Sequence, residues 1–469
     1  MRRSICSGVS KAPFRAGGYA RANRRQQNYK LNLMLPELYN AFLACQGIST
    51  DTRQITPGCL FVALRGDTFN GNEFALSALA EGARYALIDD PALAQQAPVK
   101  YQEQLLLVPD ALVALQDLAR HHRRRFTCPV VGLTGSNGKT TTKELMAAVL
   151  ASTYRVEATV GNLNNHIGVP LTLLRIDPAT TQMAVIEMGA NHQQEIAMLC
   201  RICEPTHGLI TNVGKAHLEG FGGIAGVRKG KGELFDYLAQ TGGTVFVNQQ
   251  DETLCTMAAE RHFRQVVPYY TSGQYTIEQE SPVVIFENTT TDFTPKARIE
   301  THLPGLYNFA NMTAALAVGA YFRVPQTAAL QAVAKYNPTN NRSQLITKGT
   351  NTIWLDAYNA NPSSMAAAIQ QFGQQAGRKA VILGDMYELG QESEAEHAAL
   401  GQLVAAQGFD LVLLAGHDIK YALPTLPNAY YFPDKFSLHN WIADNPMQHT
   451  HVLVKGSRGM KLETVVPFV

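Results

Sequence analysis

Residues Val130 to Thr142 read VVGLTGSNGKTTT, and this stretch decides the fold. An apolar run leads into a turn with two glycines. The turn ends in Lys-Thr-Thr at residues 139–141, and a helix is predicted over residues 143–150. A buried strand, a glycine-rich loop and a helix N-terminus in this order are typical of a phosphate-binding loop.

The residue types in the loop suit a phosphate. Gly135 and Gly138 would allow backbone N–H groups to converge on the anion, Lys139 would supply a positive charge, and the Thr140 hydroxyl would bind Mg²⁺. The common pattern G-x-x-x-x-G-K-[ST] has glycine where this chain has Leu133. A glycine-rich turn with an incidental lysine is the alternative. Because the strand and helix lie where the motif needs them, we predict a nucleoside triphosphate site.

The chain has 469 residues, which indicates about three domains. Its 46% hydrophobic and 17% charged residues describe a globular protein, and no apolar run approaches the roughly 20 residues of a membrane span. Seven scattered cysteines indicate a reducing cytoplasm. Cys200 and Cys203 form a C-x-x-C without a second pair, and we expect them to be buried at a helix end.

Charge is distributed unevenly along the chain. Residues 1–33 hold eight of the 40 Lys and Arg and no acid, which leaves 32 basic against 38 acidic residues, a net charge of −6, in the rest. This mildly acidic body does not indicate nucleic-acid binding. The basic leader resembles a transit peptide, but we favour an upstream start codon or a disordered tail, with the folded protein beginning near Met34.

Three α/β domains are predicted. Residues 34–112 form a small mixed α/β binding domain. Residues 113–323 alternate apolar strands (183–187, 208–212 and 244–247) with helices, which predicts a doubly wound sheet, and an antiparallel excursion is expected over 265–303. Residues 324–469 form a second, Rossmann-like α/β sheet. Ligands of such sheets bind beyond the carboxyl ends of the strands.

Polar residues follow successive strands of the central domain. Glu187 ends one strand, His217 follows the next, and Lys229, Lys231 and Glu233 stand at the predicted start of a helix. A carboxylate and an imidazole beside a triphosphate suit a hard metal ion. Taken singly, these residues could be a helix-capping acid, a turn histidine and solvated lysines. Their joint position behind a phosphate loop favours a metal site.

Many motifs in the chain resemble those of the Mur ligases of peptidoglycan synthesis, from about residue 46 to the C-terminus. They include TGSNGKTT, EMGANH, TNVGKAHLEGFGGIAGVRKGKGELF, LPGLYNFANMTAA, NRSQ, LGDMYELG and VLVKGSRGMKLE. The family form G-[ST]-x-G-K-[ST] also explains Leu133. DAYNANPSSM and GNLNNHIGVPLTLL are most similar to the member that joins D-Ala-D-Ala to UDP-N-acetylmuramoyl-tripeptide.

The resemblance implies a cytoplasmic, monomeric, ATP-dependent ligase for cell-wall biogenesis, which forms a peptide bond through an acyl phosphate. It implies ATP contacts at Gly135, Ser136, Asn137, Gly138, Lys139, Thr140, Thr141, Asn308, Asn311, Arg342 and Asp356. Thr140 and Glu187 would hold one Mg²⁺ and His217 a second, with Lys231 as a further metal ligand, and the catalytic residues would be Lys139, His217 and Lys231. Lys231 would carry a carbamate, with Lys229 as the alternative.

Substrate contacts are implied in the same way. The UDP-sugar would be bound by Asp51, Thr52, Arg53, Arg65, Gly66 and Asn70, the tripeptide by Asn164 and Asn165, and the dipeptide by Asn359 and Asn361. Tyr307 and Asn70-Gly71-Asn72 depart from the family's histidine and Asp-Gly-His. Lys455, Ser457 and Arg458 could be structural or close the cleft. Because Arg342 and Asp356 belong to the third domain, domain closure would complete the ATP site.

Other functions stay open at this point. A sibling ligase that adds a single amino acid and a folylpolyglutamate synthetase share the ATP chemistry, although the Asn-rich motifs disfavour both. A nucleotide-switch protein is an alternative from another class, but it would leave the two flanking domains and the polar cluster unexplained. The third residue of the tripeptide, diaminopimelate or lysine, has no readable motif.

Overall fold

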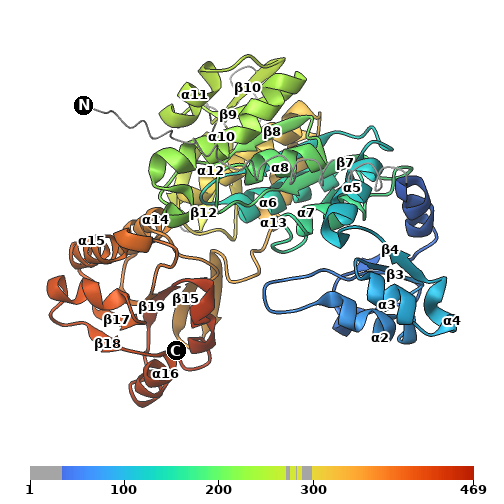
Figure 1. The fold of residues 1–469 in the computed structure, drawn as a ribbon. Helices are drawn as coiled ribbons and strands as arrows, with labels where there is room; N and C mark the ends of the chain where they lie inside the picture. Colours follow the sequence, from blue (N-terminus) through green and yellow to red (C-terminus); the bar gives the residue numbers. More distant parts are fainter. Residues whose placement is uncertain (1–33, 271–274, 281, 288–297) are drawn as a thin grey trace, which may run out of the picture. The chain divides into compact units, whose positions relative to one another are not determined.

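The computed structural model describes residues 34–270, 275–280, 282–287 and 298–469 (Figure 1). The chain forms two compact units, Met1–His122 and Arg123–Val469. The basic leader, residues 1–33, lies outside the described residues. Among the helices that are described, none has the length and apolar character needed to cross a membrane. The predicted domain boundaries at 112/113 and 323/324 stay predictions.

The first unit contains a four-stranded parallel sheet in the order β1-β2-β3-β4. A helix covers residues 34–43, and the strands and later helices are β1 (Ile48–Ser49), β2 (Leu60–Val62), α2 (Ala75–Ala80), β3 (Tyr85–Ile88), α3 (Pro91–Gln96), α4 (Val99–Gln102), β4 (Leu105–Leu107) and α5 (Ala111–Arg123). Cys59, Phe61 and Ile88 are buried in the core between the sheet and α2. The mixed α/β fold predicted for this region is confirmed.

The second unit begins with a six-stranded parallel sheet, which we call the central sheet, in the order β10-β9-β8-β5-β7-β6. Its strands are β5 (Val130–Thr134), β6 (Val156–Ala158), β7 (Met183–Glu187), β8 (His207–Ile210), β9 (Thr244–Asn248) and β10 (Gln265–Tyr269). All residues of β5, β7 and β9 are buried, which explains why the sequence shows continuous apolar runs there.

The helices around the central sheet are α6 (Lys139–Ala151), α7 (Gly168–Leu173), α8 (Glu195–Cys203), α9 (Leu218–Phe221), α10 (Ile224–Thr241), α11 (Glu252–Ala259), α12 (Tyr307–Tyr321) and α13 (Gln326–Lys335). The connection through α6 runs toward β6, whereas the connections through α8, α10 and α11 run toward β10. Right-handed crossovers in opposite directions put helices on both faces of a sheet. The predicted doubly wound fold is confirmed.

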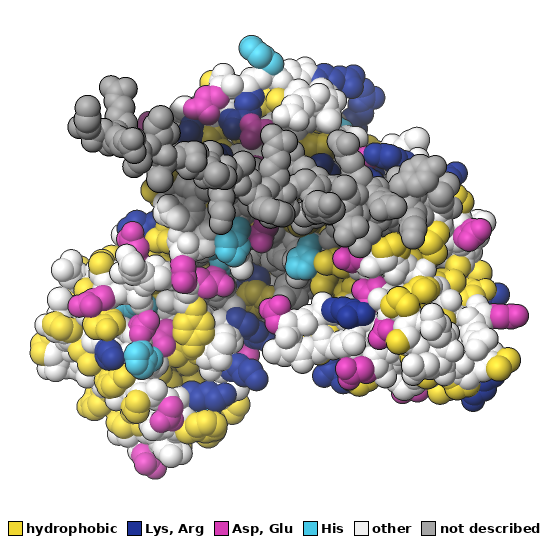
Figure 2. All heavy atoms as spheres, viewed as in Figure 1, with side chains coloured by type: hydrophobic (Ala, Val, Ile, Leu, Met, Phe, Trp, Pro, Cys, Tyr) yellow, Lys and Arg dark blue, Asp and Glu magenta, His cyan; other side chains and the backbone are white. Residues whose placement is uncertain are grey.

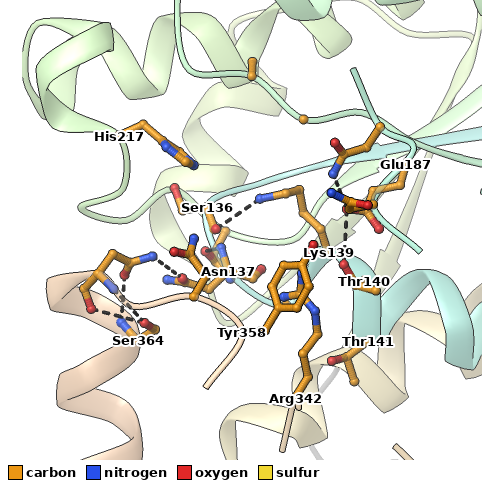
Figure 3. Close-up of a pocket in the computed structure, with 18 of the residues that line it drawn as sticks. Ser136, Asn137, Lys139, Thr140, Thr141, Glu187, His217, Arg342, Tyr358 and Ser364 are labelled. Atoms are coloured by element: carbon orange, nitrogen blue, oxygen red, sulfur yellow. Dashed lines mark hydrogen bonds between the residues drawn. The ribbon is translucent and has the colours of Figure 1, made fainter. Parts of the chain in front are cut away.

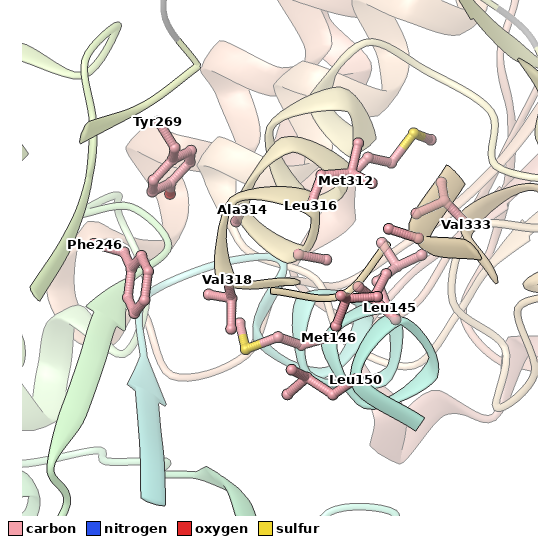
Figure 4. Packing of buried hydrophobic residues seen from close by; sticks show 14 of the residues in the cluster. Leu145, Met146, Leu150, Phe246, Tyr269, Met312, Ala314, Leu316, Val318 and Val333 are labelled. Carbon is pink, nitrogen blue, oxygen red and sulfur yellow. The ribbon is translucent and has the colours of Figure 1, made fainter. Parts of the chain in front are cut away.

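One face of the central sheet packs against α6 and α12, and α13 packs on these two helices (Figure 4). Leu145 and Met146 of α6 meet Met312 and Val318 of α12 in a core without exposed side chains. Burying such side chains stabilises the fold by about 1.5–3 kcal/mol each. This packing fixes the helix that begins directly after the glycine-rich loop.

Two sequence-based expectations for this region are wrong in detail. Residues 265–269 form β10, a parallel edge strand of the central sheet, rather than part of an antiparallel excursion. Among the described residues of this region, the antiparallel sheet consists of β11 (Tyr275–Glu280), β12 (Val283–Glu287) and β13 (Arg298–Glu300). Helix α10 begins at Ile224, so Lys229, Lys231 and Glu233 lie inside the helix and not at its start.

The C-terminal part of the second unit holds another six-stranded sheet, in the order β14-β15-β19-β16-β17-β18, with only β14 antiparallel. Its elements are β14 (Gln344–Lys348), β15 (Asn351–Asp356), α14 (Pro362–Gly373), β16 (Arg378–Gly384), α15 (Ser393–Ala405), β17 (Leu411–Ala415), β18 (Tyr430–Phe432), α16 (Lys435–Asp444) and β19 (Thr450–Lys455). The predicted Rossmann-like α/β domain is confirmed.

On the face drawn in Figure 2, basic and acidic side chains are interspersed, as the mixed composition leads one to expect.

Candidate active site

A cavity of about 650 Å³ lies at the carboxyl ends of the central-sheet strands in the second unit (Figure 3). Most of the predicted site residues of this unit line it. They are Ser136, Asn137, Gly138, Lys139, Thr140, Thr141, Asn164, Asn165, Glu187, His217, Asn308, Asn311, Arg342, Asp356, Asn359 and Asn361. Gly135 and Lys231 do not line it, and the predicted UDP-sugar residues belong to the first unit.

The glycine-rich loop needs both of its glycines. Gly135 has φ +148°, and a Cβ there would lie 1.9 Å from Thr211 Oγ1. Gly138 has φ +77°, and a Cβ there would lie 2.5 Å from Asn311 Oδ1. Both positions combine a left-handed backbone with a close approach of another side chain, so only glycine fits without a shift.

The segment after β8 holds the loop in place. The Ser136 N–H donates to the carbonyl of Asn212 at 3.0 Å, and the Asn137 N–H donates to Asn212 Oδ1 at 3.0 Å. The Thr211 hydroxyl donates to the Asn137 carbonyl at 2.6 Å. β5 and β8 are neighbours whose connections leave in opposite directions, so this is the switch point at which doubly wound sheets bind ligands.

Lys139 is the first residue of α6, and its ammonium curls back over the loop. Its Nζ donates to the carbonyls of Gly135 at 2.7 Å and Ser136 at 3.2 Å. Burial lowers the pKa of Lys139 to about 8, although the Glu187 carboxylate opposes the shift. An ammonium whose charge is costly at this place gains from an added anion.

Glu187 ends β7 and is 1% exposed. Its Oε1 accepts hydrogen bonds from Thr140 Oγ1 at 3.2 Å and from Asn164 Nδ2 at 2.7 Å. Its Oε2 is buried without a hydrogen-bond partner in the described part of the chain. Within that part no cluster of three or more His, Cys, Asp or Glu side chains suits a metal ion. A carboxylate oxygen and a hydroxyl fit a hard cation whose other ligands come from phosphates and water.

His217 lines the cavity on the other side of Lys139 from Glu187 (Figure 3). Its Nδ1 forms a hydrogen bond with Oε2 of Glu388, a residue of the loop after β16. This bond lowers the pKa of Glu388. Glu388 is not among the predicted site residues, although it belongs to the quoted LGDMYELG motif. Nothing local in the sequence links two residues that are 171 positions apart.

Lys231 lies on α10 behind the cavity wall and is fully buried. Its Nζ donates to the carbonyl of Ala190 at 3.1 Å and lies 5.0 Å from the centre of the Phe221 ring. Burial, together with the like charge of Lys139, lowers the pKa of Lys231 well below its usual range. Lys229 is exposed. Glu233, also on α10, accepts from the N–H groups of Gln194 and Ala197 and so caps the N-terminus of α8.

The two asparagines of α12 form a buried hydrogen-bonded chain. Asn308 Oδ1 accepts from Asn311 Nδ2 at 3.0 Å, and Asn311 Oδ1 accepts from the Thr142 hydroxyl of α6 at 3.0 Å. Tyr307 also lines the cavity, and its hydroxyl lies 3.4 Å from Ser343 Oγ. These contacts tie α12 to the first turn of α6 at one end of the cavity.

The C-terminal part supplies three cationic side chains to the cavity lining. The Arg342 guanidinium carbon lies 3.6 Å from the centre of the Tyr358 ring, and its Nε is buried without a hydrogen-bond partner in the described chain. Arg458 approaches the same ring at 5.4 Å. Lys455, 1% exposed, pairs with Oδ2 of Asp356. Tyr358 was not among the predicted residues, although it stands inside the quoted motif DAYNANPSSM.

Several predicted substrate residues also have structural contacts. Asn361 Nδ2 donates to Asn137 Oδ1 at 2.7 Å, while its Oδ1 caps α14 through Ser364 N at 2.9 Å. Asn165 Oδ1 caps α7 through the N–H groups of Ile167 and Gly168. The Asn361 bond joins the phosphate loop directly to the C-terminal part.

In the first unit, a polar network surrounds Asp89, a residue that the motifs did not single out. Its carboxylate accepts from Arg65 Nε at 2.7 Å and from Asn72 Nδ2 at 2.8 Å, and Asn72 Nδ2 also donates to Asn70 Oδ1 at 2.8 Å. Arg65 and Asn70 form an antiparallel bridge that positions the turn with Gly66. Asp51 forms a pair with Arg53 around Thr52. These residues thus form two separate polar groups in this unit.

Three family models match the chain: the Mur ligase family, catalytic domain over residues 45–123; the Mur ligase middle domain over 133–319; and the Mur ligase, glutamate ligase domain over 341–458. The UDP-N-acetylmuramoyl-tripeptide–D-alanyl-D-alanine ligase of Escherichia coli is 37% identical over 92% of this chain and 95% of its own. The crystal structure of MurF from Acinetobacter baumannii has a TM-score of 0.80 at 29% identity, over 92% and 97% of the two chains.

The ADP complex of MurF ligase from Thermotoga maritima has a TM-score of 0.76 at 25% identity and covers 91% of this chain and 97% of that one. The fold and the cavity define the class, a multidomain α/β protein built around a phosphate-binding loop. The chain belongs to the Mur ligase family. The resemblance read from the motifs is therefore confirmed.

Proposed function

We propose that this protein is an ATP-dependent ligase that joins D-Ala-D-Ala to UDP-N-acetylmuramoyl-tripeptide in the cytoplasm and acts as a monomer. The observation that carries the proposal is the make-up of one cavity, which is lined by the phosphate loop, by Asn164 and by Asn361. It offers a nucleotide site and amide groups suited to peptides in the same space. Relatives that carry this activity in their names cover nearly the whole chain.

The reaction has two steps. An oxygen of the tripeptide's terminal carboxylate attacks the γ-phosphorus of ATP, the bond to the β–γ bridging oxygen breaks, and ADP leaves. The dipeptide amine then attacks the carbonyl carbon of the acyl phosphate, loses its proton to a base, and phosphate departs as the peptide bond forms. Lys139 and the N–H groups of Thr140 and Thr141 would bind the phosphates, because these first-turn amides lack partners within the helix.

Thr140 and Glu187 would hold one Mg²⁺, and His217 would hold a second Mg²⁺ near the acyl phosphate. The unpartnered Glu187 Oε2 is the feature of this chain that fits the ion. Bound there, Mg²⁺ would neutralise charge on the phosphates. Arg342 would contact phosphate and Asp356 the ribose, while Asn308 and Asn311 would border the adenine.

Lys231 would carry a carbamate. The buried amine loses its proton easily, and a neutral amine can attack CO₂ to give the carbamate with release of a proton. This modification would turn a costly buried cation into an anionic ligand. The exposed Lys229 lacks the burial that would favour a neutral amine.

Lys231→Ala should reduce ligase activity nearly completely, with partial recovery in added formate or acetate, and Lys229→Ala is the matched control with wild-type activity. Circular dichroism and thermal melting would show whether the alanine variant folds. Full activity of folded Lys231→Ala, or loss of activity in Lys229→Ala alone, would contradict the assignment.

The residues of the first unit that bind the UDP-sugar in this proposal are those around Arg65 and Asp51. Arg65→Ala should raise the KM for the UDP-linked substrate with little change in kcat, because the contact would be equal in ground and transition states. The same variant should leave the KM for ATP unchanged. A lower kcat with both KM values unchanged would point to a folding defect instead.

The decisive experiment measures phosphate release with UDP-N-acetylmuramoyl-tripeptide, offered with D-Ala-D-Ala or with single amino acids. Both tripeptides, ending in diaminopimelate or lysine, should be compared. Turnover with the dipeptide alone supports the proposal. Turnover only with single amino acids would indicate a sibling ligase. Turnover of a folate would indicate a folylpolyglutamate synthetase. ATP hydrolysis at a rate that does not depend on the peptides would indicate a nucleotide switch. Light scattering after size-exclusion chromatography tests the monomer.

A further inference from the structure

The hydrogen bond between His217 and Glu388 joins two segments of unusual backbone. His217 has φ +54° and Glu388 has φ +63°. Both angles lie in the left-handed region that residues other than glycine rarely adopt. Such residues are strained and persist only where their surroundings hold them. A second contact supports the pair, since the N–H of Glu219 donates to the Glu388 carbonyl at 3.4 Å.

The loop that carries Glu388 is anchored from inside the C-terminal sheet. The N–H of Met386 donates to Nε2 of His397, a fully buried side chain of α15, at 3.0 Å. The N–H of Tyr387 donates to the hydroxyl of Ser457, which follows β19 and is 2% exposed, at 2.9 Å. Two buried side chains, one from α15 and one that follows β19, thus fix the backbone just before Glu388. The Glu388 carboxylate therefore extends from a backbone segment that is held in place.

The partner atoms decide the tautomer of His217. A carboxylate at neutral pH only accepts hydrogen bonds, so the proton of the bond must be on Nδ1. The Nε2 atom of a neutral ring then carries the lone pair. A histidine that binds a metal through one ring nitrogen commonly donates from the other to a carboxylate, which fixes both the tautomer and the ring orientation.

We propose that Glu388 is a positioning residue, which holds the His217 ring with Nε2 free to bind a metal ion in the active-site cavity. The inference rests on the proposed function, in which His217 is a Mg²⁺ ligand. Because Glu388 belongs to the C-terminal part and His217 to the central part, the ligand is correctly oriented only when the two segments meet. Glu388 itself need not touch substrate or metal.

The tautomer can be tested without catalysis. In protein with ¹⁵N-labelled histidine, at one fixed alkaline pH, wild-type His217 should show a protonated Nδ1 and an unprotonated Nε2, with His217→Gln identifying its signals. In Glu388→Ala the population should move toward the Nε2–H form that free imidazole side chains prefer. Nε2–H in the wild type, or an unchanged tautomer in Glu388→Ala, would overturn the proposal.

Kinetics provide the second readout. Glu388→Ala should need roughly 10–100-fold more Mg²⁺ for half-maximal ligase activity, as expected for loss of a residue that orients a ligand. Glu388→Asp, which keeps the charge, should recover part of the effect. Glu394→Gln, an exposed carboxylate in the first turn of α15, should match the wild type in both readouts.

The outcomes separate the two proposals. If the wild type fails to join the dipeptide but shows the Nδ1–H tautomer that depends on Glu388, the ligase function fails and the positioning role stands. If the wild type is an active ligase and Glu388→Ala needs the same Mg²⁺ concentration for half-maximal activity, the positioning role is refuted. Similar melting temperatures of the variants would show that neither result comes from misfolding.

Discussion

Glu187→Gln should separate activity from stability. The substitution keeps the shape of a side chain that is 1% exposed, so no cavity forms. The amide oxygen can still accept from Thr140 and Asn164, as Oε1 does now. What changes is the second oxygen, which has no partner in the described protein and becomes a neutral NH₂ group.

The magnitude follows from these contacts. A buried polar group without a partner costs about 1–3 kcal/mol, and more when it is charged. A neutral amide should therefore leave the free energy of unfolding unchanged or raise it by about 1 kcal/mol. In a unit of this size that corresponds to roughly 2 °C in the melting temperature. Loss of a metal contact worth several kcal/mol should lower ligase activity by on the order of 10²–10³-fold.

Thermal melting with ADP, in the presence and absence of Mg²⁺, provides the assay beside phosphate release. A ligand at 100 times its dissociation constant stabilises a protein by about 2.7 kcal/mol, so the Mg²⁺-dependent increment should be clear in the wild type and largely lost in Glu187→Gln. Glu157→Gln is the control, because this carboxylate pairs with Arg175 on the surface and should affect neither quantity. A marked drop in melting temperature with activity within about threefold of wild type would refute the reasoning.

Two further predictions concern pH and the loop. Burial lowers the pKa of His207 to about 4, so stability should fall as pH drops from the ordinary histidine range toward 4, where the unfolded chain binds the extra proton. Melting curves should show a smaller loss for His207→Gln, and equal losses would contradict this. Gly135→Ala should weaken ATP binding at least ~100-fold because its Cβ meets Thr211. Gly242 also has a positive φ, +67°, but faces open space, so Gly242→Ala carries the backbone strain without the clash and should bind ATP normally. Calorimetric titration with ATP distinguishes the two.

The elements that the sequence predicted best are those whose pattern of residues lies within the element itself. The apolar run 183–187 is exactly as long as β7, because a central parallel strand buries both faces and needs no polar residue. Helix α6 begins four residues before its predicted start, at Lys139. Lysine followed by three threonines is a weak helix signal, and the first turn is instead held by tertiary contacts such as the bond from Thr142 to Asn311.

The glycines of α10 misled the prediction for a different reason. Glycine in a helix costs about 1 kcal/mol relative to alanine and normally argues against a helix. Here a Cβ on Gly226 would lie 1.8 Å from the Phe221 carbonyl oxygen, and one on Gly230 would lie 2.3 Å from the Phe221 ring. These glycines permit close packing of α9 on α10. Helix propensity includes the cost of a glycine, but it does not include the neighbouring residue that leaves no room for a Cβ.

The residues of the candidate site also differ in how well local sequence predicts them. Spacing within one segment was enough to predict the phosphate loop and the polar residues at the next strand ends, since parallel strands end at one edge of a sheet. Glu388, Tyr358 and Asp89 were missed because their contacts are with residues that are not adjacent in the sequence. Motif membership was the available signal for Glu388 and Tyr358, yet a motif does not state which atom its residues contact.

Two buried atoms without partners explain why nucleotide binding should draw the parts of the second unit together. Glu187 Oε2 belongs to the central sheet and is anionic, whereas Arg342 Nε belongs to the C-terminal part and is cationic; both residues line the cavity. Each leaves hydrogen-bonding capacity unused at a cost of about 1–3 kcal/mol. A magnesium–triphosphate complex carries charges of both signs and would satisfy both. Its binding energy would therefore depend on the two parts being in place at once, which makes their association part of ATP recognition.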